Sequence, residues 1–318
     1  MQRRALGRTG IMVTPVGFGS QTIGGLGYGD QDWETSQPTA DAYLQGGGRL
    51  IDSARGYGVS EIYVGKALQR FAQAAEVTVC SKSGSTHPPV LRGDMEVSRF
   101  CLQRERIDVY YVHVPPADFD DLRRVLDAYE QFRKEGKIRF IGVSQKGLLT
   151  PHERDEGWRY LDDPRIDVMQ FPYSLARPEV APLLAEAGRR GIGVVVRQAL
   201  EGGLLTDKFR PGHRFTDRAN DWRAHIDPQA MEQALRQIDD IRRRFVRPPY
   251  RTLAQLALSF VLANADVSAT IPGAGNPQEM RDNLSVNELP PMPAALAADL
   301  TEAARGLVHL LRRNRSKG

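Results

Sequence analysis

Leu50-Ile51-Asp52-Ser53-Ala54-Arg55-Gly56-Tyr57-Gly58 begins as a short apolar run, ends that run on a carboxylate and continues into a turn that carries a tyrosine. The next two apolar runs also carry an ionisable residue near their ends. Lys82 ends the first of them, and His113 lies within the second. Short apolar runs predict buried strands. Ionisable side chains are almost never fully buried unless they are paired. Asp52, Lys82 and His113 therefore need partners, and a shared site is the simplest way to provide them.

Eight apolar runs, separated by helical patterns, are spaced along the chain, which predicts alternating strands and helices in a parallel sheet. The predicted strand cores are residues 16–19, 50–52, 77–81, 109–113, 140–143, 168–170, 193–197 and 268–271. Between the fourth and fifth cores, apolar residues from Leu122 to Phe132 are spaced by three and four, as an amphipathic helix requires. Right-handed crossovers make closure the simplest topology, so the predicted fold class is α/β, a (β/α)8 TIM barrel.

In a barrel of this kind the active site gathers at the C-terminal ends of the strands, and neighbouring strands lie about 5 Å apart. We therefore expect Asp52, Lys82 and His113 to form one cluster, with Tyr57 above it. Lys82 would stabilise the phenolate of Tyr57 and lower the pKa of a phenol that ordinarily titrates near ~10, while Asp52 would keep Lys82 protonated. His113 would orient a substrate oxygen.

Together these four residues would supply a general acid to a carbonyl group. General acid catalysis increases the reaction rate by roughly 10² to 10⁴. The set contains no good nucleophile for the carbonyl carbon. Hydride from a nicotinamide is the natural partner, because cofactors supply the difficult redox step while the protein supplies a proton and orientation.

Each of the four residues also has a structural explanation. Asp52 and Lys82 can form a structural ion pair, since structural ion-pair networks also perturb pKa values. Tyr57 can be an aromatic residue of the turn, and His113 can be a core histidine whose hydrogen bonds are satisfied. Taken singly, these alternatives stay open. The joint placement at successive strand ends favours a catalytic site.

The composition predicts a single domain over residues 1–318 with no membrane span. The chain has 43 Lys and Arg against 39 Asp and Glu, a net charge of +4, and two cysteines, too few for a disulfide framework. The N-terminus lacks the apolar stretch of a signal peptide, so a cytoplasmic protein is expected. Basic runs at 242–244 and 312–315 are interpreted as a solvated helix face and a tail, and no nucleic-acid, membrane or metal partner is predicted.

The run 52–58, together with the lysine that ends the next strand and the histidine that ends the following one, resembles the aldo-keto reductase superfamily. Other stretches resemble the same family, and with the run above they lie in the expected order over residues 1–284: residues 6–10, 16–19, 136–139, 141–144, 202–206 and 271–273. The resemblance implies an NAD(P)H-dependent oxidoreductase that reduces an aldehyde or ketone to an alcohol, or the reverse, with Tyr57 as general acid or base. Two alternatives stay open: a cofactor-binding regulatory subunit with little turnover, and a biosynthetic enzyme acting on a bulky sugar or polyketide ketone.

Two segments fall outside the alternation of strands and helices. Residues 206–227, after the seventh strand, form a long polar and aromatic connection, and loops of that length are usually functional or disordered. We interpret this segment as a substrate-covering loop, with a surface insertion as the alternative. Residues 290–311 predict a proline-rich linker followed by one extra C-terminal helix over 294–311. In the family such a segment can line the substrate mouth, and a packing helix is the alternative.

The chain lacks a Rossmann fingerprint, because the glycine-rich residues 24–29 do not have the Gly-x-Gly-x-x-Gly spacing. Late βα loops of a barrel can hold phosphates instead, and residues 200–204 and 273–277 suit that task. By resemblance, Ser144 and Gln170 hold the nicotinamide amide and Asn283 the adenine. The full set of cofactor contacts that the resemblance implies is Gly19, Ser20, Gln21, Asp52, Ser144, Gln145, Gln170, Arg197, Leu200, Gly203, Gly273, Gly275, Glu279 and Asn283.

Two positions near the nicotinamide depart from the family pattern. Arg197 stands where the family often has a Tyr that stacks on the nicotinamide, so a guanidinium plane would have to replace that ring. Gln145 stands where Asn is common.

The family default is NADPH, but the residues that would bind its 2′-phosphate also differ from the family pattern. Many NADP-dependent members carry Lys or Arg in the Ile-Pro-Gly loop that here begins at Ile271, or in the helix after it. This chain has Gly273, Gly275 and Glu279 there, and only Arg281 and Lys208 could compensate. A carboxylate repels a 2′-phosphate but accepts a hydrogen bond from a ribose 2′-hydroxyl. NADPH and NADH are therefore both predicted, with a small carbonyl compound as substrate, and the sequence does not specify that compound, the direction of reaction or the oligomeric state.

Overall fold

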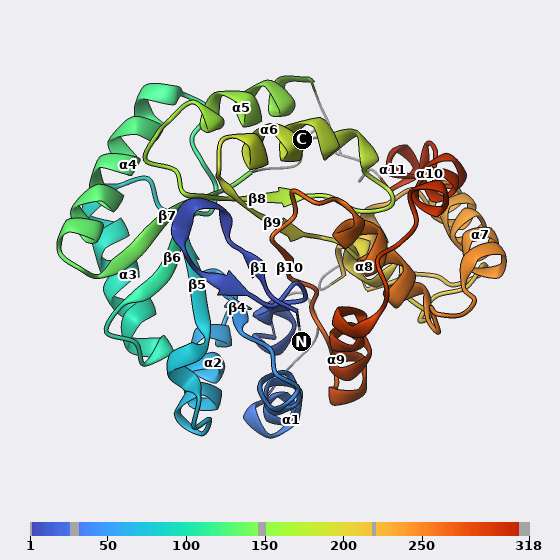
Figure 1. The fold of residues 1–318 in the computed structure, drawn as a ribbon, viewed down its shortest axis with the longest axis horizontal. Helices are drawn as coiled ribbons and strands as arrows, with labels where there is room; N and C mark the ends of the chain where they lie inside the picture. Colours follow the sequence, from blue (N-terminus) through green and yellow to red (C-terminus); the bar gives the residue numbers. More distant parts are fainter. Residues whose placement is uncertain (1, 26–31, 146–150, 218–220, 312–318) are drawn as a thin grey trace.

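The computed structural model describes residues 2–25, 32–145, 151–217 and 221–311. Eight parallel strands follow one another around a barrel in sequence order (Figure 1). They are β3 (Phe18–Gly19), β4 (Leu50–Asp52), β5 (Thr78–Ser83), β6 (Ile107–Val112), β7 (Ile138–Ser144), β8 (Val168–Pro172), β9 (Gly193–Arg197) and β10 (Ala269–Thr270). A bridge between Val16 and Thr270 brings the first strand beside the last. The predicted α/β barrel is therefore confirmed as a nearly closed one, and each predicted apolar run overlaps one strand.

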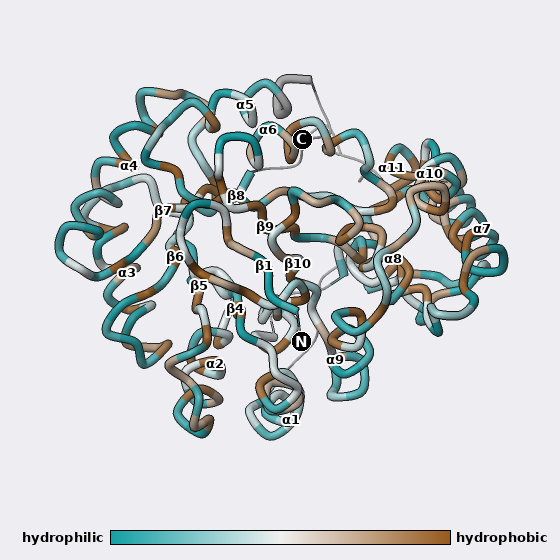
Figure 2. Tube along the Cα trace, viewed as in Figure 1, coloured by the Kyte–Doolittle hydropathy of each residue, from teal (hydrophilic) through white to brown (hydrophobic). Residues whose placement is uncertain are grey.

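Helices cover the outside of the barrel (Figure 1). They are α1 (Trp33–Gln45), α2 (Ser60–Gln69), α3 (Pro88–Leu102), α4 (Phe119–Lys134), α5 (Pro151–Leu161), α6 (Ala181–Arg189), α7 (Pro228–Phe245), α8 (Leu253–Ala263) and α9 (Pro277–Leu284). In α4, the carboxylate of Asp118 accepts two backbone N–H groups at the N-terminus, and the predicted apolar face from Leu122 to Phe132 is buried. The trace in Figure 2 alternates between hydrophobic and hydrophilic segments along the helices, as packing on one face requires. No described helix is long and apolar enough to cross a bilayer.

The strands separate two apolar cores, because successive side chains of a strand point to opposite faces. Ile51 and Val79 belong to the core between the strands and the helices. Leu50, Cys80 and Val109 belong to the core inside the barrel. Residues two positions further along the inner faces therefore also point inward, nearer the C-terminal ends of the strands.

A hairpin of β1 (Arg4–Ala5) and β2 (Met12–Val13), which the sequence interpretation did not include, covers the N-terminal end of the barrel. Leu6 from the hairpin joins the inner core with Leu50 and Val168, each of which begins its strand. The hairpin and these inner-core residues close the N-terminal end of the barrel. A polar site can therefore lie only at the opposite end, where the strands finish.

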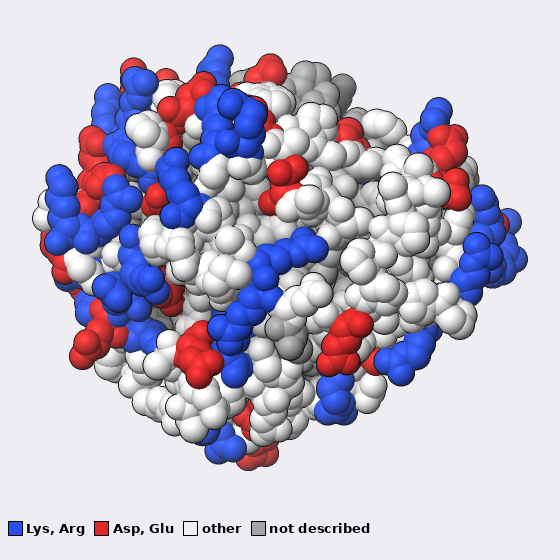
Figure 3. All heavy atoms as spheres, viewed as in Figure 1, with Lys and Arg blue, Asp and Glu red and all other residues white. Residues whose placement is uncertain are grey.

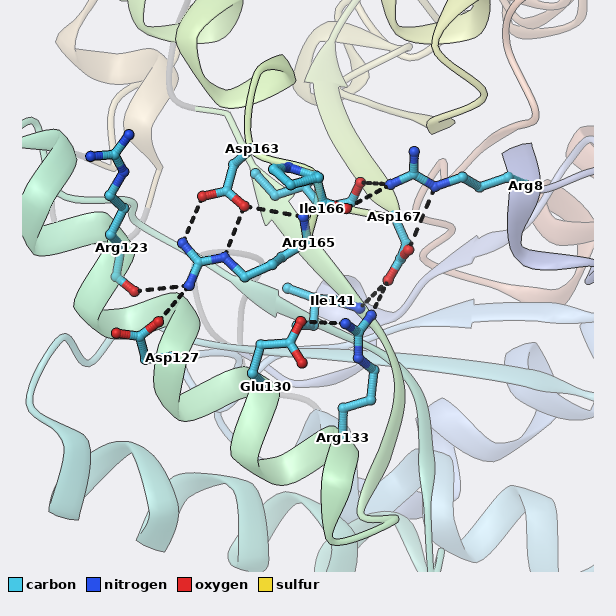
Figure 4. A network of polar contacts seen from close by, with 11 residues as sticks. Arg8, Arg123, Asp127, Glu130, Arg133, Ile141, Asp163, Arg165, Ile166 and Asp167 are labelled. Atoms are coloured by element: carbon cyan, nitrogen blue, oxygen red, sulfur yellow. Dashed lines mark hydrogen bonds and ion pairs between the residues drawn. The ribbon is translucent and has the colours of Figure 1, made fainter.

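A network of charged side chains supports the closed end (Figure 4). Asp167, just before β8, lies 3.8 Å from Arg8 of the hairpin turn and 3.2 Å from Arg133 of α4. Its carboxylate also accepts the backbone N–H of Ile141 at 3.1 Å. Asp167 thus joins the hairpin, a helix and two strands at the end of the barrel that carries no predicted site residue.

The C-terminal segment forms two helices, so the prediction of one helix over 294–311 is wrong. α10 (Ala294–Ala303) ends, and α11 (Leu307–Leu310) begins after Gly306, whose φ of +80° is left-handed. A left-handed residue interrupts helical hydrogen bonding, and glycine adopts this conformation at no steric cost. Both helices contact α7, so the segment packs on the outside of the barrel.

The basic run 242–244 lies on the last turn of α7, where acidic residues one turn earlier neutralise it. Arg242 pairs with Asp239, Arg243 lies 3.5 Å from Asp239, and Arg244 lies 3.1 Å from Asp240. On the face of the molecule in Figure 3, basic and acidic side chains lie intermixed over the outer helices. The interpretation of this run as a charged helix face is confirmed, while residues 312–315 lie outside the described part of the chain.

Candidate active site

Three of the four candidate catalytic residues lie on inner faces at the ends of neighbouring strands. Asp52 ends β4, Lys82 lies one residue before the end of β5, and His113 follows β6 directly. Each comes two residues after a member of the inner core, namely Leu50, Cys80 and Tyr111. The strand period of two therefore continues from the apolar interior into a polar cluster.

Lys82 is the centre of this cluster. Its side chain is fully buried, and its Nζ donates hydrogen bonds to the carboxylate of Asp52 and to the carbonyl of Ser53, the latter at 2.7 Å. Burial disfavours the ammonium, but the charge of Asp52, its hydrogen bond with Lys82 and the nearby Tyr57 together outweigh burial and raise the pKa of Lys82 above its usual value. Lys82 is therefore a cation at neutral pH.

Tyr57 lies in the turn after β4 and faces the same cluster. The Nζ of Lys82 lies 4.8 Å from the centroid of its ring. The imidazole of His113 meets that ring edge to face, with centroids 5.5 Å apart. The turn is held close to residue 24, where any Cβ would collide with the carbonyl oxygen of Tyr57, so Gly24 is required there.

His113 is a neutral imidazole in this environment. Its burial, together with the nearby charges of Lys82 and Arg197, lowers the pKa of His113 to about 3. Its backbone N–H donates to the carbonyl of Ser83 at 2.8 Å and so extends the pairing of β6 with β5. A neutral imidazole can donate a hydrogen bond to a substrate oxygen without carrying a charge.

A second group of predicted residues adjoins the first. Gln170 on β8 donates from Nε2 to Oδ2 of Asp52 at 2.5 Å, while Lys82 donates to Oδ1 of the same carboxylate. Ser144 on β7 pairs with Gln170 in the register of β7 and β8. Among the described residues, Oε1 of Gln170 is buried without a hydrogen-bond partner. A buried acceptor in this state is costly unless a ligand donates to it. The carboxamide of a nicotinamide carries such a donor, so the residues present fit that group.

Arg197 ends β9 on the inner face. Its guanidinium donates to the carbonyl of Gln145 at 2.5 Å, while its Nε is buried without a partner among the described residues. Arg197 acts electrostatically on Tyr57, Asp52 and His113, so it adjoins the cluster around Lys82.

Sequence reasoning missed a buried ion pair beside Arg197. Arg177 donates to both carboxylate oxygens of Glu201, at 2.7 and 3.0 Å, and the hydroxyl of Ser174 donates to the same carboxylate at 2.6 Å. Arg177 lies in the connection after β8, and Glu201 begins the short 3-10 helix after β9, so no strand or helix period indicates that their side chains will meet. The only available signal was a carboxylate in the glycine-rich run 200–204.

The predicted phosphate loops lie at the ends of β9 and β10. Leu200 precedes the short 3-10 helix Glu201–Gly203, Gly203 ends that helix, and Gly273 and Gly275 precede α9. Asn283 is buried and donates to the carbonyl of Gly273 at 3.3 Å. Two further candidate cofactor contacts, Ser20 and Gln21, begin a 3-10 helix after β3, directly following Gly19, and the Ser20 hydroxyl donates to the backbone carbonyl of Asp52 at 2.9 Å.

Glu279 occupies the anion-attracting N-terminus of α9. Its carboxylate accepts the backbone N–H of Gly275 at 3.0 Å and the side-chain amide of Asn276 at 2.8 Å. Lys208, from the segment after β9, reaches across to the same carboxylate at 2.9 Å. Free amides at a helix N-terminus favour an anion, and here the chain supplies its own.

The long segment 206–227 packs on the glycine turn after β9. Arg223 donates to the carbonyl of Gly202 at 2.7 Å, and its guanidinium lies over the rings of Phe209 and Phe215, 4.8 and 4.7 Å from their centroids. The described part of this segment is therefore anchored beside the predicted phosphate loop. Its role as a substrate cover stays a prediction.

Comparisons with known proteins identify the family. A model of the Aldo/keto reductase family matches residues 15–305. The chain is 29% identical to the NADH-specific methylglyoxal reductase of Escherichia coli over 95% of this chain and 99% of that protein, and 27% identical to aldo-keto reductase YhdN of Bacillus subtilis over 88% and 87%. An aldo-keto reductase of Bacillus halodurans, solved in its holo form, has the same fold, with a TM-score of 0.75 at 24% identity over 96% of this chain and 97% of that one. The chain belongs to the aldo/keto reductase family, whose members are oxidoreductases that use a nicotinamide cofactor.

Proposed function

We propose that this protein reduces a small aldehyde or ketone to an alcohol with NADH or NADPH, using Tyr57 as the proton donor. The observation that carries the proposal is the contact of the buried Lys82 ammonium with the ring of Tyr57, because a fixed cation favours the phenolate that remains after proton transfer. Asp52 holds that cation in place, and His113, neutral at physiological pH, orients the carbonyl oxygen by donating a hydrogen bond.

The cofactor, when bound, supplies the hydride. The carbonyl carbon would accept that hydride while Tyr57 donates its proton to the carbonyl oxygen. The electron pair of the C=O π bond then goes to oxygen, and the O–H bond of the phenol breaks as the O–H bond of the alcohol forms. Lys82 stabilises the negative charge left on Tyr57 until solvent returns the proton. In the oxidative direction the same phenolate removes the alcohol proton.

The chain's own residues fit the cofactor at both ends. The free acceptor of Gln170 suits the nicotinamide carboxamide, with Ser144, Gln145 and Arg197 beside it. At the other end, the carboxylate of Glu279 suits a ribose 2′-hydroxyl better than a 2′-phosphate, because its negative charge repels a phosphate and it already accepts the backbone N–H of Gly275 just before α9. We therefore favour NADH over NADPH, and the relative named as an NADH-specific methylglyoxal reductase supports this choice.

A carbonyl panel tests the proposal. The purified protein is titrated with NADH and NADPH by fluorescence, and NADH oxidation is then followed with short aldehydes, 2-oxoaldehydes and ketones. Saturable turnover with at least one small carbonyl compound is the expected result. Tight cofactor binding with no turnover across the panel would favour a cofactor-binding regulatory subunit instead, and no binding of either cofactor would overturn the proposal.

A further inference from the structure

In the described part of the chain, Arg197 is a cation of the site with no carboxylate in direct contact with it. Among the described residues, Lys82 pairs with Asp52 and Arg177 pairs with Glu201, whereas no carboxylate accepts a hydrogen bond from Arg197. His113 contributes no charge at neutral pH. Counting only these described residues, the two ion pairs cancel and one positive charge is left, on the guanidinium of Arg197.

This guanidinium is costly to maintain in its position. Its Nε is buried without a hydrogen-bond partner among the described residues, and burial lowers the pKa of Arg197. The residue as a whole is partly exposed, but a charged group that loses part of its hydration without an ion-pair partner is still costly. A residue kept in this state at a strand end of the site points to a role with the ligand.

From this surplus charge we infer that Arg197 makes the site bind the reduced nicotinamide more tightly than the oxidised one, an inference that rests on the proposed function. The nicotinamide ring is neutral in NADH and carries a positive charge in NAD⁺. Because Tyr57 delivers the proton to the same carbonyl that accepts hydride, the ring must lie within two van der Waals contacts of Tyr57. The guanidinium that acts on Tyr57 electrostatically therefore also acts on the ring.

The size of the effect follows from Coulomb's law. At an effective dielectric constant of about 20, two unit charges about 10 Å apart repel strongly enough to change a binding constant roughly tenfold, and closer charges do more. A tenfold preference corresponds to about 1.4 kcal/mol. The functional consequence is a reductase that releases its oxidised cofactor readily and resists inhibition by excess NAD⁺.

Calorimetric titration of the full chain with NADH and NAD⁺ tests the inference without any carbonyl substrate. In the unaltered protein we expect Kd for NAD⁺ to exceed Kd for NADH by about tenfold or more. Arg197→Met should reduce that ratio to within about threefold, mainly by lowering Kd for NAD⁺. Arg197→Lys keeps the charge and should preserve most of the ratio. Arg197→Gln repeats the neutral change if the Met variant unfolds on a thermal melt.

Arg124→Met is the matched control, because it removes the same charge from an exposed side chain of α4. It should leave the ratio unchanged, since exposed charges are screened by salt. A ratio near one in the unaltered protein, or a ratio that persists in both neutral variants, would overturn the inference while the proposed function stands. Failure of the unaltered protein to bind either form would overturn the proposed function and the inference with it.

Discussion

Lys82 on β5 donates a hydrogen bond to the carboxylate of Asp52 on the neighbouring strand β4, and both side chains are buried. A buried ion pair of this kind is weak evidence for stability, because desolvation of two charges offsets their attraction. The pair does keep an ammonium 4.8 Å from the ring centroid of Tyr57. Its position therefore supports the proposed role of Tyr57 better than it supports a role in folding.

Tyr57→Phe should remove most turnover and leave the cofactor site intact. The phenol is the only proton donor that the proposed reaction uses, and loss of a general acid costs roughly 10² to 10⁴ in rate. We expect kcat/KM for the best carbonyl substrate to fall by that factor while Kd for NADH changes less than about twofold. Tyr63→Phe, the same change on α2 outside the cluster, is the control, and turnover that survives in Tyr57→Phe would remove Tyr57 from its role.

Lys82→Met should lose both activity and stability, whereas a double variant separates the two losses. Removing one partner of a buried pair leaves the other charge uncompensated and costs about 3 to 5 kcal/mol, while replacing both partners with apolar residues is often close to neutral. Lys82→Met combined with Asp52→Leu should therefore recover much of the free energy of unfolding measured with urea. It should not recover turnover, because the cation beside Tyr57 is still missing.

Stability should fall in acid through His113. The pKa of His113 is about 3 in the folded protein against an ordinary value of 6.5, so between these two pH values the unfolded chain binds the additional proton. The contribution of His113 to stability is fully present above pH 6.5 and is lost as the pH falls toward 3, at up to about 1.4 kcal/mol per pH unit. The free energy of unfolding of His113→Gln, measured from pH 4.5 to 7.5, should decline less steeply than that of the unaltered protein. Parallel curves for the two proteins would contradict this.

The barrel and the cluster around Lys82 were predictable because two simple rules place them. Strand side chains alternate with a period of two, and barrel sites lie where strands end, so Asp52, Lys82 and His113 could be assigned to one place from their positions in three apolar runs. The positive charge of Lys82 could also be predicted, because Asp52 was expected beside it. The orientation of Tyr57 was harder, because a turn residue has no period to fix it.

The features that escaped prediction depend on contacts between distant loops. Arg177 and Glu201 meet across two connections, and their pairing has no periodic signal in the sequence. The hairpin 4–13 was too short to be recognised as strands. The break at Gly306 did have a signal, because a glycine inside a helical pattern is a possible helix end, and the sequence interpretation did not use it.

Glu279→Gln should shift cofactor preference toward NADPH. The substitution removes the negative charge beside the start of α9 but keeps the side-chain shape, and it releases Lys208, which otherwise lies 2.9 Å from Glu279. An unpaired Lys at a helix N-terminus attracts a 2′-phosphate. We expect Kd for NADPH to fall by about tenfold, with little change for NADH, in fluorescence titrations. Equal effects on both cofactors would show that Glu279 supports the loop without selecting the ribose.

Glu201→Gln should destabilise the protein far more than the same change on the surface. Arg177 and Glu201 are both buried, so removing the carboxylate leaves a guanidinium uncompensated, at a cost of about 3 to 5 kcal/mol. Glu302→Gln breaks an exposed pair with Arg305, in which the side chains are 66% and 78% exposed, and should cost less than about 1 kcal/mol. Urea unfolding of the two variants compares an identical chemical change in two environments. Because Arg197 lies within electrostatic reach of Glu201, the buried variant should also raise the ratio of Kd for NAD⁺ to Kd for NADH, whereas a ratio that falls would mean that Glu201 does not offset the positive charge of the site.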